Sequence, residues 1–171
     1  MFRKTEILGA DDSVIQVFAF DNLSGDPFGP EFAAFLFFDK NGTELAEAHK
    51  QFLATKAVLV LSNPIGFAEI YAFTDTTGTD QVNEEVSLAR LRAVQDFLSQ
   101  QGVPADKAFD PTNHRFFGEK FARQRDPDNT DDPSFRAVAI GLWKDIFKVR
   151  RPEFLSLPSF QFAREEEVLE L

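Results

Sequence analysis

The stretch that most constrains the fold is residues 73–97, which joins the end of a short apolar run, residues 70–73, through a turn to a long amphipathic segment. The apolar run ends at Phe73, and the turn after it contains Thr74, Asp75 and Gly78. At 100° per residue, the apolar side chains of the following segment share one continuous arc. These side chains are Val86, Leu91, Ala93, Val94, Phe97 and Leu98. The pattern predicts a strand, a turn and then a helix that packs on a sheet.

One charged residue, Arg90, falls inside this apolar arc. A guanidinium on an apolar face is costly unless it meets an anion. Asp75, in the loop before the helix, supplies a negative charge at the mouth of the same strand-to-helix crossover. Three interpretations are open: Asp75 caps the turn or the helix, Asp75 pairs with Arg90, or both side chains bind a ligand.

The other elements are predicted from apolar runs bounded by turn residues. Strands are predicted over residues 13–20, 32–38, 67–73, 115–118 and 135–143. A first helix is predicted from Glu44 to about Leu61 with Thr43 as its cap, and Asp80 or Asn83 is predicted to cap the second helix. Residues 124–134, rich in Asp, Asn and Pro, are predicted to be an exposed loop, and the tail after 143 to hold one strand and a short acidic helix.

From residue 31 the order of these elements is β-α-β-α-β-β. This order predicts an α/β sandwich, in which a mixed sheet carries its helices on one face. Right-handed crossovers would make the first strand pairs parallel, and the closing strand would enter antiparallel.

Composition excludes several classes of function. The net charge of −10 argues against binding nucleic acid or an anionic membrane surface. No apolar run approaches the ~18–20 residues of a transmembrane helix, and the first residues lack the apolar region of a secretory signal. The absence of cysteine excludes disulfides, thiolate metal sites and a cysteine nucleophile. His49 and His114 are isolated from acids at ligand spacing, so neither a metal nor another cofactor is expected.

Five short motifs in order resemble the OmpA-like peptidoglycan-binding domain family, which includes the peptidoglycan-associated lipoproteins. The central motif is Thr74-Asp75-x-x-Gly78-x-x-x-x-Asn83-x-x-Val86-Ser87-x-x-Arg90. The others are Phe37-Phe38-Asp39, the run from Gly102 to Lys107, Phe117-Gly118-Glu119, and the run from Arg136 to Ile140. The resemblance covers about residues 32–143. It implies an OmpA-like domain over residues 31–143, an N-terminal extension over 1–30 that forms a strand or hairpin, and a C-terminal extension over 144–171.

The resemblance also implies a ligand. In this family an Asp and an Arg at the positions of Asp75 and Arg90 clamp the diaminopimelate of the peptidoglycan stem peptide. Asp75 would receive the ammonium and Arg90 the carboxylate, because a guanidinium offers a planar fork of N–H donors. Further residues expected to line or adjoin this ligand site are Asp39, Thr74, Asn83 and Arg136. The implied function is recognition without catalysis.

The sequence departs from the family pattern at several positions beside this site. The departures are Ala72, Phe73, Ala89, Leu91 and Ala137. An alternative is an assembly or adaptor protein that keeps the fold and binds a protein partner through its two extensions. A hydrolase using Asp39 and Asp75 as paired carboxylates is a third alternative. The expected location is the periplasm or cell envelope if an export signal has been removed or export is non-standard, and otherwise the cytoplasm.

Overall fold

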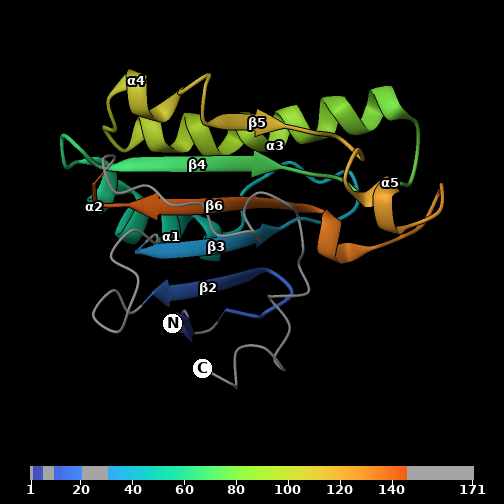
Figure 1. Cartoon of the computed structure of the whole chain (residues 1–171), viewed down its shortest axis with the longest axis horizontal. Helices are drawn as coiled ribbons and strands as arrows, with labels where there is room; N and C mark the ends of the chain where they lie inside the picture. Colours follow the sequence, from blue (N-terminus) through green and yellow to red (C-terminus); the bar gives the residue numbers. More distant parts are fainter. Residues whose placement is uncertain (1, 6–9, 21–30, 146–171) are drawn as a thin grey trace.

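The protein is built around a six-stranded mixed sheet, seen in a computed structural model that describes residues 2–5, 10–20 and 31–145. The order of the strands across the sheet is β1-β2-β3-β6-β4-β5 (Figure 1). The strands are β1 (Phe2–Thr5), β2 (Ile15–Phe20), β3 (Phe32–Phe37), β4 (Phe67–Ala72), β5 (His114–Phe116) and β6 (Ala137–Trp143). The predicted strands therefore form, with ends shifted by up to two residues.

The closing strand β6 lies in the middle of the sheet. It pairs antiparallel with β3 on one side and with β4 on the other, while β4 pairs in parallel with β5. β3, β4 and β5 therefore run in one direction and β6 against them, so the sheet is mixed as predicted. The expectation that the first crossover joins neighbouring parallel strands is wrong, because β6 separates β3 from β4.

Two helical segments connect the strands that share a direction. The first runs as α1 (Glu47–Phe52), a π-helical turn η1 (Leu53–Ala57) and α2 (Val58–Leu61). It begins later than predicted, with Ala46 in place of Thr43 at the N-cap, where the ring Nδ1 of His49 accepts the Ala46 amide at 3.1 Å. The second is α3 (Asp80–Gln100). Thr79 caps α3 by accepting the Val82 amide at 3.3 Å, so the caps predicted at Asp80 and Asn83 are wrong.

Three shorter helices complete the described part of the chain. They are α4 (Ala105–Ala108), α5 (Ala122–Arg125) and the 3₁₀ turn η2 (Pro133–Phe135). Figure 1 shows α5 beside the end of the sheet where β4 stops and β6 starts. None of the helices in residues 2–5, 10–20 and 31–145 combines the length and apolar character needed to cross a bilayer.

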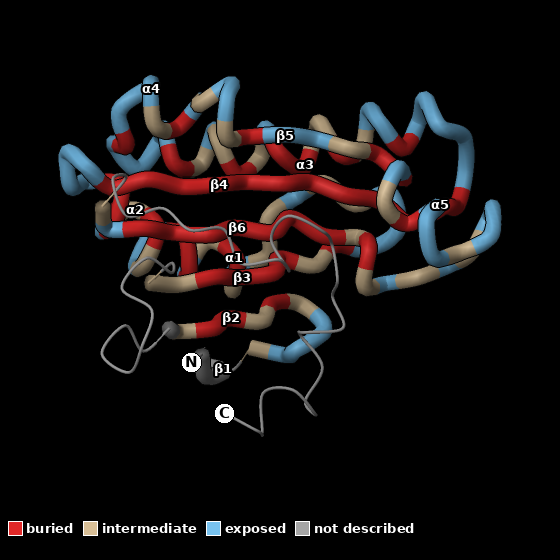
Figure 2. Tube along the Cα trace, viewed as in Figure 1, coloured by how far each residue is buried: buried red, intermediate tan, exposed pale blue. Residues whose placement is uncertain are grey.

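The central strands β4 and β6 are buried along their whole length and β3 along most of it (Figure 2). On one face the long helices pack against aliphatic side chains, for example Phe52, Leu91 and Leu98 against Ile70 and Ile140. On the other face the buried side chains are mainly aromatic, and Ala122 of the short helix α5 packs among them. This second cluster includes Phe18, Phe35, Phe67, Tyr71, Phe73, Ala122, Phe135 and Trp143. Covering both faces explains why β3, β4 and β6 read as nearly continuous apolar runs.

The N-terminal part adds to the same sheet. β1 and β2 pair antiparallel, and β2 pairs antiparallel with β3. Ile15 and Val17 of β2 are buried in the aliphatic core. The predicted strand and acidic helix of the tail fall within residues 146–171, which lie outside the described residues.

Candidate functional site

The predicted ligand site lies where β3 and β4 end and β6 begins. Because β6 runs against both neighbours, its first residues meet the last residues of the two other strands at one edge. The Phe38 amide donates to the Arg136 carbonyl at 2.8 Å, and the Phe73 amide donates to the Ala137 carbonyl at 2.8 Å. Asp75 follows directly after the second of these contacts. Segments far apart in the sequence are thus joined around the turn at residues 74–78.

Arg90 enters this edge from α3 and is almost completely buried, at 1% exposure. It donates to three backbone carbonyls: from Nε to Gly42 at 2.8 Å, from Nη1 to Phe73 at 2.8 Å and from Nη2 to Asp39 at 3.1 Å. Its guanidinium carbon lies 5.1 Å from the centre of the Phe38 ring, at cation–π distance. Burial lowers the pKa of Arg90 to about 10, opposed by the charge of Asp75 and assisted by that of Arg136. The side chain therefore remains a cation at neutral pH.

The Asp75 carboxylate is 2% exposed, and both of its oxygens accept hydrogen bonds. Oδ1 accepts from the Thr77 hydroxyl at 2.6 Å and from the Thr77 amide at 3.2 Å. Oδ2 accepts from Arg136 Nη1 at 3.2 Å and from the Asp132 amide at 3.2 Å. Asp75 therefore stabilises its own turn, which is one of the three interpretations open from the sequence. No ion pair joins it to Arg90, although the structure describes both residues.

Arg136, at the start of β6, is the ion-pair partner of Asp75. Its Nη1 also donates to the Asp131 carboxylate, and its Nε donates to the Phe38 carbonyl at 3.3 Å. Arg136 thus bridges the turn after β4 and the segment just before its own strand. The sequence predicted Arg136 as a residue of the ligand site, and an arginine at the start of a strand often pairs with a nearby acid.

The remaining predicted residues occupy different places at this edge. The Asp39 side chain is exposed, and its backbone carbonyl is the atom that meets Arg90. Thr74 is buried, its amide donates to the Gly118 carbonyl at 2.9 Å, and its hydroxyl has no partner among the described residues. Asn83 is buried and donates from Nδ2 to the Glu119 carboxylate.

Glu119 belongs to a second polar network on the outer side of the turn. Arg123 links its carboxylate to that of Asp80, the first residue of α3. Asn83 therefore connects to this network, and no hydrogen bond joins its side chain to Asp75 or Arg90 in the described structure. The sequence offered Glu119 as part of a family motif but gave no signal that it would meet Asn83.

The loop predicted over residues 124–134 carries exposed side chains, but its backbone is tied to the turn after β4. The Thr76 hydroxyl donates to the Pro127 carbonyl at 2.7 Å and accepts the Thr130 amide at 2.8 Å. The Asn129 amide donates to the Thr76 carbonyl at 2.9 Å. Together with the Asp132 amide on Asp75, these contacts fix residues 127–132 across the site. We call residues 127–132 the strap.

Comparison with known proteins identifies the family of this chain. The model of the OmpA family matches residues 37–136, which is more than half of the chain. The chain belongs to the OmpA family. The match covers the turn after β4 and α3 and ends at Arg136, just before β6, and so includes Asp75, Arg90 and Arg136.

Individual relatives match this OmpA-family chain either over a short stretch or at low sequence identity. Outer membrane protein A of Serratia odorifera is 43% identical over 42 residues, which cover 25% of this chain and 17% of that protein. The chain therefore spans only about a sixth of the length of this relative. The crystal structure of the periplasmic domain of MotB has a TM-score of 0.51 at 14% identity, with 95% of this chain and 82% of that one covered. The peptidoglycan-associated lipoprotein from Burkholderia pseudomallei has a TM-score of 0.49 at 19% identity, with 63% and 88% covered. At these identities the structural likeness concerns the fold alone.

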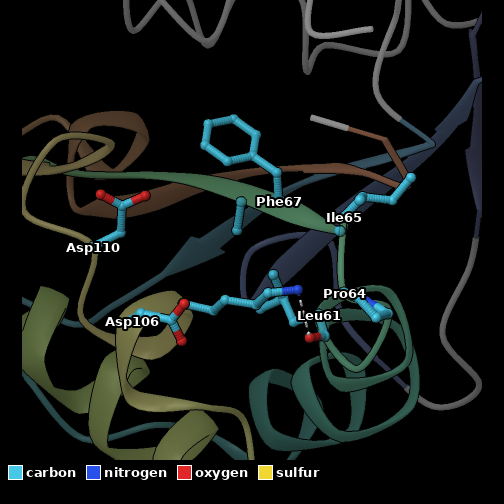
Figure 3. A pocket seen from close by; sticks show the side chains of 9 residues that line it. Leu61, Pro64, Ile65, Phe67, Asp106 and Asp110 are labelled. Atoms are coloured by element: carbon cyan, nitrogen blue, oxygen red, sulfur yellow. Dashed lines mark hydrogen bonds between the residues drawn. The ribbon is translucent and has the colours of Figure 1, made fainter. Parts of the chain in front are cut away.

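The OmpA-family site is distinct from the pocket seen in Figure 3. That pocket, of about 230 Å³, lies at the opposite end of β4, between α2, α4 and the first residues of the strand. Leu61, Ile65 and Phe67 form its apolar wall, and Asp106 and Asp110 lie at its side. Within residues 2–5, 10–20 and 31–145, no three His, Asp or Glu side chains gather so as to hold a metal ion.

Proposed function

We propose that this chain is a non-catalytic module that binds peptidoglycan, and that it recognises the diaminopimelate of the stem peptide through Asp75 and Arg90. Membership of the OmpA family supports the wider function. The finer assignment rests on the arrangement of charges at the edge of the sheet.

One observation carries this assignment: the buried Asp75 carboxylate is ion-paired with Arg136 at the edge of the sheet where the guanidinium of Arg90 is also buried. Asp75 pairs with Arg136, and the charges of both residues act on the buried Arg90. The amino-acid end of diaminopimelate carries one ammonium and one carboxylate. Asp75 complements the ammonium, and the two arginines complement the carboxylate.

Arg90 keeps capacity for a ligand in spite of its backbone contacts. A guanidinium has five N–H donors, and three of those of Arg90 meet carbonyls of the described chain. The remaining donors and the Thr74 hydroxyl would add hydrogen bonds to the ligand carboxylate. Asp39, exposed at the same edge, would contact the surrounding stem peptide, and Asn83 would hold the N-terminal turn of α3 in place through Glu119.

The hydrolase alternative finds less support in this geometry. Both oxygens of Asp75 are engaged in hydrogen bonds, while the Asp39 side chain is exposed. The adaptor alternative concerns the two extensions, and much of these lies outside the described residues. A protein partner on the extensions therefore stays a prediction, as do the domain boundaries at residues 31 and 143. We place the proposed function in the cell envelope, where peptidoglycan lies.

The test is sedimentation of the full chain with purified sacculi, together with calorimetric titration of diaminopimelate. Asp75→Asn removes the charge and keeps an oxygen for the Thr77 hydroxyl, so the turn should persist while binding is lost. Asp96→Asn makes the same change of charge at an exposed position of α3 and should bind as the wild type does. A folded Asp75→Asn variant that still sediments with sacculi at wild-type affinity would remove the proposed site.

A further inference from the structure

We propose that the strap, residues 127–132, is a closing segment that must lift from the turn after β4 before a ligand can reach Asp75. The structure shows the closed state, in which the protein's own groups occupy the Asp75 carboxylate. The inference rests on the proposed function, because it concerns how a ligand enters that same site.

Three strap residues hold the closed state through their backbone. The Asn129 and Thr130 amides donate to the Thr76 carbonyl and hydroxyl, at 2.9 and 2.8 Å. The Pro127 carbonyl accepts from the same hydroxyl at 2.7 Å. Thr76 therefore serves as one anchor point for three strap contacts.

The strap also blocks the charge that a ligand ammonium would need. The Asp132 amide occupies Asp75 Oδ2 at 3.2 Å, beside Arg136 Nη1. Asp131 of the strap accepts from the same Nη1, and so helps to hold the guanidinium against Asp75. A ligand ammonium would have to replace both the amide and the guanidinium, since Asp75 is buried. Arg136 thus competes with the ligand ammonium for the Asp75 carboxylate, and the strap keeps Arg136 in position.

The composition of the strap suits a segment that opens without unfolding the domain. Its residues are Pro127, Asp128, Asn129, Thr130, Asp131 and Asp132. None of them belongs to either core cluster. Lifting the strap therefore exchanges its hydrogen bonds, and the ion pairs of Asp131 with Arg136 and of Asp132 with Arg125, for contacts with water and removes no side chain from the core. Both ends are fixed: Ala122 before the strap and Phe135 after it are buried in the aromatic cluster. The motion is therefore confined to the segment between two anchored ends.

The decisive experiment locks the strap with an engineered disulfide in the full chain. The natural chain has no cysteine, so Thr76→Cys with Thr130→Cys introduces a single pair. The Thr130 amide lies 2.8 Å from the Thr76 hydroxyl, which places the two positions close enough for a bridge. The oxidised and reduced forms share one sequence, so each controls for folding of the other.

Calorimetric titration with diaminopimelate should give at least about a tenfold weaker affinity for the oxidised form than for the reduced form. The reduced form should bind at least as tightly as the wild type, because it lacks the Thr76 hydroxyl contacts. Equal affinities of the oxidised and reduced forms would overturn the strap proposal while leaving the proposed function intact.

Hydrogen exchange of the strap amides is a second measurement that needs no ligand. It tests the strap proposal even if no form of the protein binds diaminopimelate. The Asn129, Thr130 and Asp132 amides should exchange with solvent at one common rate, at least about tenfold faster than the Phe38 and Phe73 amides at the same edge of the sheet. Asp131→Asn should speed this exchange because it releases Arg136, and Asp128→Asn should leave it unchanged. Strap amides that exchange as slowly as those of Phe38 and Phe73 would overturn the proposal.

Discussion

At the scale of single residues, Arg90 acts first as a structural cation. Its three hydrogen bonds join α3 to the loop after β3, through Asp39 and Gly42, and to the end of β4, through Phe73. Backbone carbonyls at the ends of strands lack partners within the sheet, and a planar fork can satisfy several of them at once. The same contacts hold the guanidinium in a fixed orientation, which favours recognition of a carboxylate.

Replacing Arg90 by Lys should therefore cost stability as well as binding. A single ammonium cannot reach three carbonyls arranged around a guanidinium plane, so buried carbonyls are left without donors. We expect a loss of about 3 kcal/mol in the free energy of unfolding, measured by chemical denaturation. Arg92→Lys, at an exposed position on the same helix, should change it by less than about 0.5 kcal/mol. Equal stabilities of the two variants would contradict the structural role.

His114, at the start of β5, should make stability depend on pH. Burial lowers the pKa of His114 to about 4, partly opposed by the charge of Asp110, while the unfolded value is 6.5. Between these values the unfolded chain binds a proton that the folded chain refuses, so stability is complete above pH 6.5 and falls as the pH drops towards 4. The loss is on the order of 3 kcal/mol at pH 4.

His114→Gln should remove this part of the pH dependence, measured as unfolding free energies from pH 4.5 to 7. Burial also lowers the pKa of His49, so some dependence of the same sign should remain in the variant. Observation of the His114 ring by NMR gives a direct check. A midpoint of ring protonation near 6.5 would refute the argument.

The sequence predicted which charged residues gather at the site but not how they pair. The apolar arc of α3 placed Arg90 towards the sheet, and the turn placed Asp75 at its mouth. The observed partner of Asp75 is Arg136, and the Asp132 amide completes its contacts. These partners come from a segment whose polar, Pro-containing composition predicts only an exposed loop. Composition reports the solvent exposure of side chains and does not show where backbone amides point.

At the scale of elements, the connections between helices and strands set the limits of prediction. Element types followed from periodicity, but the start of the first helix and both helix caps did not. Ala46 serves as N-cap through the His49 ring, a contact that no capping rule based on Ser, Thr, Asp or Asn would find. The order of the strands in the sheet could not be predicted either, because the apolar pattern of a strand does not identify the strands that pair with it.

Two glycines in these connections should respond differently to substitution by alanine. At Gly66, between α2 and β4, an added Cβ would lie 1.9 Å from the Val60 carbonyl oxygen, so the backbone must move. At Gly102, after α3, φ is +91° but nothing lies within 4 Å of an added Cβ. We expect Gly66→Ala to cost about 3 kcal/mol and Gly102→Ala about 1 kcal/mol, measured by thermal and chemical unfolding. A larger cost for Gly102→Ala than for Gly66→Ala would show that backbone strain at Gly102 outweighs the steric clash at Gly66.

At the scale of the whole molecule, the N-terminal strands and the OmpA-like part share one core. Ile15 and Val17 join the aliphatic cluster, and Phe18 of the same strand joins the aromatic cluster on the other face. β2 also covers the edge of β3, which would otherwise expose unpaired backbone groups. The sequence predicted a strand here but not that it would contribute to both clusters.

A chain that begins at residue 31 should therefore be much less stable than the full chain. Each of the three lost side chains contributes roughly 1.5–3 kcal/mol by burial, so their sum is comparable with the entire stability of a typical domain. We expect circular dichroism to show partial unfolding at 25 °C and size-exclusion chromatography to show association through the bare β3 edge. A monomeric 31–171 chain with an unchanged unfolding midpoint would show that the first thirty residues are dispensable.

The central position of β6 has a consequence for the order in which the protein acquires its fold. β6 pairs Phe32 with Leu142 and Phe67 with Trp143, so the strand that joins β3 to β4 is the last of the described strands to leave the ribosome. Until then β3 and β4 lack the strand that lies between them in the folded sheet. Pairings this distant in sequence slow folding, because the entropy of closing the chain is lost before contacts compensate for it. The nascent protein must therefore reach residue 143 before its sheet can close.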